Sequence, residues 1–268
     1  FCLLDDAMIS MKYAANLAAG HGLVWNPGEY IEGYTNLLWT LVMALCHLVG
    51  LTPSHTCLMV QILGIAMLWA CMVATLRLAR TCRLPALSAS AAVVLVGTYY
   101  HLMFFSLVGM EVGLVTFLVT GALTATVASL QESRGRASPL IWLAVAVLVR
   151  PDVIWIVLVV AAALLWRVRA RRSFVLLGLA AAVLAAGGHM AWSRYYYGDW
   201  MPNTYYLKAT GWPLAPRLYT GLMQSWRTGV SLSLPILLGG LACLERRKLW
   251  LFLLLAVPLL AMAYEIYV

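Results

Sequence analysis

The stretch CLMVQILGIAMLWACMVATL (57–76), followed at once by RLARTCR (77–83), decides the class of this protein. As a helix, such an uncharged run is long enough to cross about 30 Å of hydrocarbon. Arginines directly after it mark the cytoplasmic end of a membrane span, because short cytoplasmic loops carry an excess of Lys and Arg. The segment therefore predicts a helix that crosses the membrane from the outer side to the inner side.

The rest of the chain has the same character. Of its 268 residues, 63% are hydrophobic and only 10% are charged, and the mean hydropathy is +0.88; a soluble domain is nearer half apolar and a quarter charged. The net charge of +8 comes from short basic clusters beside apolar runs, which set topology and do not form a nucleic-acid surface. The predicted fold is all-α, a polytopic bundle of transmembrane helices in one membrane domain that contacts lipids and no nucleic acid.

Four basic clusters determine the remaining topology, since the positive-inside rule places all of them in the cytoplasm. They are RLARTCR (77–83), RGR (134–136), RVRARR (167–172) and ERRK (245–248). Consistent alternation then predicts membrane segments at 57–76, 87–104, 110–130, 139–149, 152–166, 173–192, 229–244 and 249–264. The chain starts at Phe1 with FCLL and ends on an apolar run without a polar tail. We therefore expect a fragment cut at both ends, with about nine membrane segments once the missing first helix is counted.

This topology leaves two extracytoplasmic regions, a first outer loop at 5–56 and a second at 193–228. Membrane helices fill 57–192 and 229–268. The acidic residues support the assignment, because most of them fall on the outer side and only Glu132 and Glu245 fall inside. The acids predicted to lie outside are Asp5, Asp6, Glu29, Glu32, Glu111, Asp152 and Asp199.

Two segments need special treatment. The segments 139–149 and 152–166 are each shorter than a full span of about 20 residues. We predict a shallow hairpin with Arg150-Pro151-Asp152 at its tip, because one long broken helix would put RVRARR outside. The apolar run TNLLWTLVMALCHLVGL (35–51) would invert every later loop if it crossed the membrane. It is predicted to be an amphipathic helix on the outer interface, so the first outer loop carries interfacial helices.

The cysteines show no CxxC spacing and mostly lie in apolar runs, where cysteine behaves as a small hydrophobe. We assign them neither a disulfide nor a metal. They are Cys2, Cys46, Cys57, Cys71, Cys82 and Cys243.

The adjacent acids Asp5 and Asp6 stand where the chain leaves the membrane. They precede AMISMKYAANLAAG (7–20), a predicted helix that Gly20 or Gly22 closes. Helical spacing puts a carboxylate, a phenol and an amide on one face and a second carboxylate and an ammonium beside it. The first face is Asp6, Ile9, Tyr13 and Asn16, and the second is Asp5, Met8 and Lys12.

Two interpretations of the acid pair stand side by side. In one, Asp5 is an N-cap and Asp6 is a first-turn acid stabilised by the helix dipole. In the other, one carboxylate is the general base for a hydroxyl acceptor and the other holds that acceptor or a cation. A divalent cation, Mg²⁺ or Mn²⁺, is left open, because two adjacent acids are too few ligands to require a metal.

The first outer loop also resembles a known family. It is similar to that of bacterial membrane glycosyltransferases of the GT-C type, and most like the mycobacterial arabinofuranosyltransferases that add terminal arabinose. Two later stretches look similar as well, LVRPD (148–152) and YYYGDWMPNTYYLKATG (195–211). The chain departs from the family at Lys12, where Arg is commoner, and at Val153, where Gly often follows the preceding R-P-D unit. The matching elements of the first loop are Asp5-Asp6, Lys12-Tyr13-Ala14, Asn16, GHGLV (20–24), NPGE (26–29), EGYT (32–35) and Trp39.

The resemblance implies an inverting sugar transfer from a polyprenyl-phosphate donor to a glycan or lipid acceptor. The reaction would take place on the outer face of a bacterial plasma membrane, in cell-envelope biosynthesis, with arabinofuranose as the first candidate sugar. An acid of the Asp5-Asp6 pair would be the general base. The polyprenyl phosphate holds its anionic head at the interface, so an outward-facing cation is needed to bind it and to stabilise the leaving phosphate.

Arg150 is the first candidate for this cation, because an arginine at membrane depth needs a cavity and a partner. Lys208 and Lys12 come next. The alternatives are a structural ion pair of Arg150 with Asp152 or Glu111, and a solvated interfacial lysine at position 208.

Sugar or acceptor contacts are assigned to side chains of both outer regions. Amide and phenol groups bind hydroxyls, and aromatic faces pack on sugar rings; membership of an interfacial aromatic belt is the alternative for the tyrosines. Glu29 and Glu32 either position the acid pair or shape the loop. The candidates are Tyr13, Asn16, Glu29, Glu32, Tyr34, Asn203, Tyr205 and Tyr206.

Other functions compete with this one. A transporter or flippase of lipid-linked sugar would be expected to carry charge within its spans and repeated halves. A non-catalytic scaffold would tolerate replacement of Asp5 and Asp6. Among enzymes, a lipid A or protein glycosyltransferase of the same fold is the main alternative.

Overall fold

The computed structural model describes residues 1–168, 170–210, 215–216, 219–223 and 226. Within these residues the regular elements are helices, apart from one isolated β-bridge between Arg134 and Ala170. The predicted all-α class is confirmed for this part of the chain. The predicted segments 229–244 and 249–264, with Cys243 and the ERRK cluster at 245–248, lie outside the described residues.

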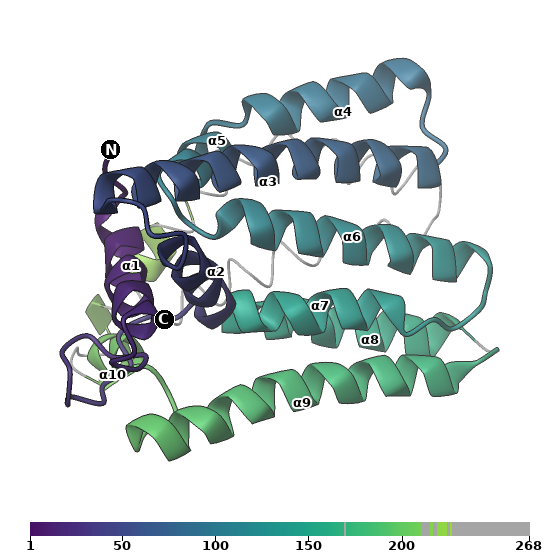
Figure 1. The fold of residues 1–268 in the computed structure, drawn as a ribbon. Coiled ribbons are helices and arrows are strands. Elements are labelled where there is room, and N and C mark those ends of the chain that lie inside the picture. The colour runs from purple at the N-terminus through teal and green to yellow at the C-terminus, as the bar shows by residue number, and fades with distance from the viewer. Residues whose placement is uncertain (169, 211–214, 217–218, 224–225, 227–268) are drawn as a thin grey trace.

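A row of helices lies side by side in one layer (Figure 1). The order across the layer is α4 (Ala86–Thr98), α3 (Pro53–Thr81), α6 (Val112–Gln131), α7 (Ser138–Val149) and α9 (Arg172–Tyr197). Two further helices pack against this layer, α5 (Tyr100–Leu107) on α3 and α6, and α8 (Ile154–Arg167) on α7 and α9. At one end of the layer, on the left in Figure 1, lie α1 (Asp5–Ala18), α2 (Leu37–His47) and α10 (Asn203–Thr210).

Three described helices are long and apolar enough to cross a membrane. They are α3, α6 and α9, with 29, 20 and 26 residues. At 1.5 Å per residue, 20 residues cover about 30 Å, the thickness of the hydrocarbon core. The pair α4 and α5 would add a fourth span if its two helices cross together. The described part of the chain therefore has the helices of a multi-pass membrane protein.

The predicted span at 87–104 is not one straight helix. Tyr99 has an extended backbone, with φ −67° and ψ 110°, and the axes of α4 and α5 differ by 47° at this break. The bend brings α5 so close to α3 that a Cβ at Gly64 would collide with the carbonyl oxygen of Ser106. No Pro stands in this segment to signal the break.

The predicted hairpin at 139–166 is confirmed. Arg150 ends α7 in the extended conformation typical of a residue before proline, and Pro151 opens the short 3₁₀ turn η1 (Pro151–Val153) that leads into α8. The expectation that the tip lies only part of the way across is wrong, because Arg150 bonds Glu111 at the very start of α6. The twelve-residue α7 is about 18 Å long, so the hairpin falls short at its base, where Ala137 lies against Gly178 well inside α9.

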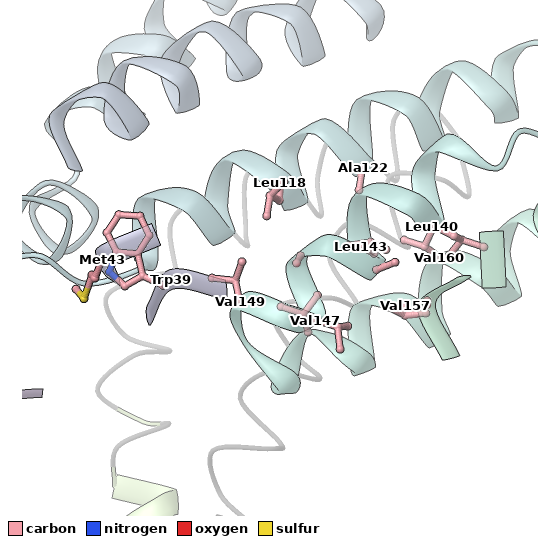
Figure 2. Packing of buried hydrophobic residues seen from close by; sticks show 14 of the residues in the cluster. Trp39, Met43, Leu118, Ala122, Leu140, Leu143, Val147, Val149, Val157 and Val160 are labelled. Carbon is pink, nitrogen blue, oxygen red and sulfur yellow. The ribbon is translucent and has the colours of Figure 1, made fainter. Parts of the chain in front are cut away.

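The apolar core lies where α6, α7 and α8 meet, and it continues onto α2 (Figure 2). Small and branched side chains dominate, which allows close approach of the helices. The labelled residues are Leu118 and Ala122 on α6, Leu140, Leu143, Val147 and Val149 on α7, Val157 and Val160 on α8, and Trp39 and Met43 on α2.

Each end of the layer is fastened by its own contacts. At the end away from α1, Gln131 donates to the carbonyl of Thr81 at 2.9 Å, and the amide of Gly135 donates to the carbonyl of Ala170 at 2.8 Å. At the other end, the amide of Leu4 donates to the carbonyl of Val108 at 2.9 Å. We call these the basic end and the acidic end, because the first carries arginines 77–83, 134–136 and 167–172 and the second carries Asp5, Asp6, Glu32, Glu111 and Asp152.

The segment predicted to lie on the interface forms α2, an eleven-residue helix of about 16 Å. This length is too short for a span, and α2 packs against α1 at the acidic end. Alternation of the described helices between the two ends thus follows the predicted order.

The close approach of α3 and α5 can be tested at Gly64. Gly64→Ala is expected to lower the free energy of unfolding by about 1–3 kcal/mol, because the backbone of Ser106 must shift. Gly187→Ala is the matched control: no atom of the described residues lies within 4 Å of its Cβ position, so the change should be neutral or stabilising. Thermal unfolding in detergent measures both, and equal midpoints for the two variants would contradict the close contact at Gly64.

Candidate functional site

The first loop folds back against its own helix at the end of α1. Gly20 adopts φ +81°, and the amide of His21 donates to the carbonyl of Asn16 at 2.9 Å, as in a Schellman motif. The Asn16 side chain then donates from Nδ2 to the carbonyls of Val24 and Trp25, both at 2.7 Å. The predicted closure at Gly20 is confirmed, and the Asn16 amide is bonded within the protein.

Two buried tyrosines hold the next part of the loop. The Tyr13 hydroxyl donates to the carbonyl of Ile31 at 2.7 Å and accepts from the amide of Gly33 at 2.9 Å. Its ring meets Tyr34 edge to face at 5.0 Å, and the Tyr34 hydroxyl lies 3.1 Å from that of Tyr197. Burial raises the pKa of Tyr13 and of Tyr34, so both stay neutral hydrogen-bonding groups. Both side chains are 2% exposed, and their contact with a sugar stays a prediction.

Tyrosines at the end of α9 form hydrogen bonds with the first loop. The Tyr197 hydroxyl donates to the carbonyl of Leu23 at 2.6 Å, and the amide of Leu23 donates to the Tyr196 hydroxyl at 3.1 Å. At the start of α10, the amide of Asn203 donates to the carbonyl of Glu32 at 2.8 Å. The two regions predicted to lie outside, 5–56 and 193–228, therefore meet in one place.

An acid and a histidine form a buried pair near these contacts. Glu32 Oε1 lies 3.4 Å from His189 Nε2, and the two side chains are 2% and 8% exposed. Among the described residues, neither carboxylate oxygen of Glu32 nor Nε2 of His189 has a hydrogen-bond partner. His189 was not among the predicted site residues; its signal was its place as the lone ionisable residue of the apolar run 173–192.

Asn36 connects three helices at the acidic end. Its Oδ1 accepts from Ser10 Oγ of α1 at 2.8 Å and from Thr40 Oγ1 of α2 at 3.0 Å. Its Nδ2 donates to Glu111 Oε2 at 2.8 Å, next to the start of α6. All four residues are buried, so the amide satisfies polar groups that would otherwise be costly. Ser10, Asn36 and Thr40 were not among the predicted site residues.

Arg150 extends this network to the hairpin tip. Its Nη1 donates to Glu111 Oε1 at 3.0 Å, and its Nε and Nη2 donate to the two oxygens of Asp152 at 3.3 and 3.2 Å. Burial alone would lower the pKa of the guanidinium, but Asp152 and Glu111 raise it above its ordinary value. Arg150 is thus a charged member of an ion network, the structural alternative considered for it. Its side chain keeps 39% exposure, and three of its five N–H donors are used.

Asp5 and Asp6 form the first turn of α1, and both are exposed. The interpretation of Asp5 as an N-cap is wrong, because Leu4 occupies that position and, within the described part of the chain, no side chain caps the helix. Met8 and Lys12 are exposed on the same side as Asp5. The polar residues Ser10, Tyr13 and Asn16 of α1 are bonded inside the protein, so the charged groups that α1 presents are Asp5, Asp6 and Lys12.

The remaining candidates lie around this end. Glu29 is exposed and accepts from Asn26 Nδ2 at 2.9 Å, a contact that shapes the loop. Tyr205 and Tyr206 lie on α10, half-buried, with ring centroids 5.9 Å apart. Lys208 belongs to α10, and its side chain lies outside what the structure describes. Phosphate and sugar contacts by these residues stay predictions.

The described residues gather no group of three or more His, Cys, Asp or Glu side chains that could hold a metal ion. A cation bound to Asp5 and Asp6 alone stays a prediction. Comparison of the chain with protein-family models, with curated proteins and with solved structures finds no match.

The ion network can be tested at Glu111. Glu111→Gln puts an amide NH₂ against a donor of Asn36 or of Arg150 and removes a charge from the pair. We expect a loss of about 1–3 kcal/mol in the free energy of unfolding. The matched control is Glu132→Gln, which removes an exposed pair with Arg136 and should change stability little. Thermal unfolding of both in detergent decides, and an equally small effect at Glu111 would refute the network.

Proposed function

We propose that the chain is a membrane glycosyltransferase of the GT-C type that uses a polyprenyl-phosphate sugar on the extracytoplasmic face. The observation that carries this proposal is the contrast along α1: its inward polar side chains hold the loop, whereas Asp5, Asp6 and Lys12 are presented to the surroundings. Two adjacent carboxylates on a fastened helix are suited to general base catalysis, which needs a base held in one place. The resemblance of the first loop supplies the reaction class.

The proposed reaction is a single displacement with inversion. The acceptor hydroxyl oxygen attacks the anomeric carbon of the sugar, and the bond from that carbon to the prenyl-phosphate oxygen breaks. The leaving phosphate takes the electron pair of this bond. One carboxylate of Asp5 and Asp6 receives the hydroxyl proton, and the other orients the acceptor.

Lys12 is the better placed cation for the leaving phosphate. Arg150 already faces two carboxylates, Glu111 and Asp152, so this group as a whole is negative and would repel a phosphate. Lys12 lies seven residues after Asp5 on the exposed side of α1, roughly 10 Å along the helix axis. This separation leaves room for a sugar between a base and a phosphate ligand. Lys208 is the second candidate from the neighbouring α10.

The test is release of polyprenyl phosphate by the full-length protein in membranes, with arabinofuranosyl and hexosyl donors. Asp5→Asn and Asp6→Asn keep the shape of each side chain and remove its basicity, and at least one should lower the release rate by about 10²–10⁴-fold. Asp199→Asn is the control, because it removes an exposed acid of the second outer region and should leave release unchanged.

Each other outcome has a defined meaning. Full release by both Asp5→Asn and Asp6→Asn would refute the acid pair as base. Equal loss in Asp199→Asn would point to a general effect of charge. No release by the wild type with any donor would favour a transporter of lipid-linked sugar over an enzyme.

A further inference from the structure

Arginines gather at the basic end, opposite to the acid pair. The described residues of this end carry one acid, Glu132, which is bonded to Arg136 at 2.6 Å. The described cations of this end are arginines. Guanidinium differs from ammonium in that it binds phosphate with two parallel hydrogen bonds. The exposed arginines are Arg77, Arg80, Arg83, Arg134, Arg136, Arg167, Arg171 and Arg172.

Backbone contacts join two loops of this surface. The loop before α7 and the loop before α9 are joined by the β-bridge of Arg134 with Ala170 and by the hydrogen bond from Gly135 to Ala170. Bridged backbones lie about 5 Å apart. The side chains of Arg134 and Arg171 therefore start from neighbouring points on the backbone. Gly135 is buried, and a Cβ there would collide with the carbonyl oxygen of Arg171. The junction therefore depends on glycine.

The surroundings of this junction indicate a lipid. Trp166, Phe174 and Leu177 are 69%, 44% and 61% exposed close to it, on the ends of α8 and α9. The Arg171 guanidinium lies 5.7 Å from the centre of the Phe174 ring. A soluble anion would contact the arginines and leave these apolar side chains uncovered. A phospholipid would cover both, with its phosphate on the guanidinium groups and its chains on the apolar residues.

We infer that the joined loops form a binding site for the phosphate of an anionic phospholipid, with Arg134 and Arg171 as its main ligands. Arg172 adds its Nη donors, since its Nε is bonded to the carbonyl of Val168. Arg136 contributes less, because Glu132 engages it. In the predicted orientation this lipid belongs to the cytoplasmic leaflet. The inference does not depend on the proposed enzymatic function.

The probe is phosphatidylglycerol, titrated into detergent-solubilised protein against phosphatidylcholine, with bound lipid counted by native mass spectrometry. Arg134→Gln with Arg171→Gln should weaken phosphatidylglycerol binding by roughly tenfold or more. The control is Arg77→Gln with Arg80→Gln, which removes the same charge from the end of α3 and should have a much smaller effect. Binding of phosphatidylcholine should be the same in all variants.

Gly135→Ala separates a built site from diffuse charge. It removes no charge but breaks the junction of the two loops, so it should also weaken phosphatidylglycerol binding. If Gly135→Ala proves unstable, the double arginine variants decide alone, because these side chains are exposed and their unfolding temperatures should match the wild type.

Two results would overturn the inference. Equal loss in the two double arginine variants would mean that general positive charge holds the lipid. Displacement of phosphatidylglycerol by inorganic phosphate at the same concentration would mean a site for soluble anions. Loss confined to the variants of the junction, with no such displacement, supports the lipid site.

Discussion

The carboxamide of Asn36 is the point on which the acidic end depends. Its oxygen accepts hydrogen bonds from hydroxyls of α1 and α2, and its NH₂ group donates to Glu111 beside α6. Glu111 in turn accepts a hydrogen bond from Arg150 at the hairpin tip. A buried network of this kind is stable only when every member is satisfied, because an unpaired polar group in an apolar interior is costly. It also fixes how the four helical units meet. The position of Asp5 and Asp6 is therefore set by bonds to residues far from them in the sequence.

Charge is sorted along the helix layer in a way that gives its two ends different chemistry. At the acidic end, carboxylates outnumber cations and the guanidinium of Arg150 is already neutralised by Glu111 and Asp152. At the basic end, the described residues carry one acid, Glu132, beside the arginines. The short hairpin of α7 and α8 reaches the acidic end fully and falls short at the basic end. It thereby supplies a half-buried ion pair to one face and a joined pair of loops to the other.

The sequence predicted what is local and missed what is distant. Hydrophobic periodicity predicted the apolar helices, and proline predicted the hairpin at Arg150-Pro151. The preference of glycine for a positive φ predicted the helix end at Gly20. All three are found in the structure. Helical spacing also placed Tyr13 and Asn16 on the same face as Asp6. It could not tell whether that face meets solvent or protein, which depends on what the loop does after Gly20. The partnership of Asn36 with Glu111 spans 75 residues, and no local pattern announces it. The bend at Tyr99 was missed for the same reason, since tertiary packing on Gly64 accompanies it.

The hydrogen bonds between the first loop and α9 have a consequence for biosynthesis. Leu23 bonds to tyrosines that follow it by 173 and 174 positions. At about 5–20 residues per second, a ribosome needs roughly 10–35 seconds to make the intervening chain. During that interval α1 and its loop exist without their partner, exposed to proteases and to chaperones. The insertion of α9, rather than the synthesis of α1, thus sets the moment at which the acidic end becomes a defined structure.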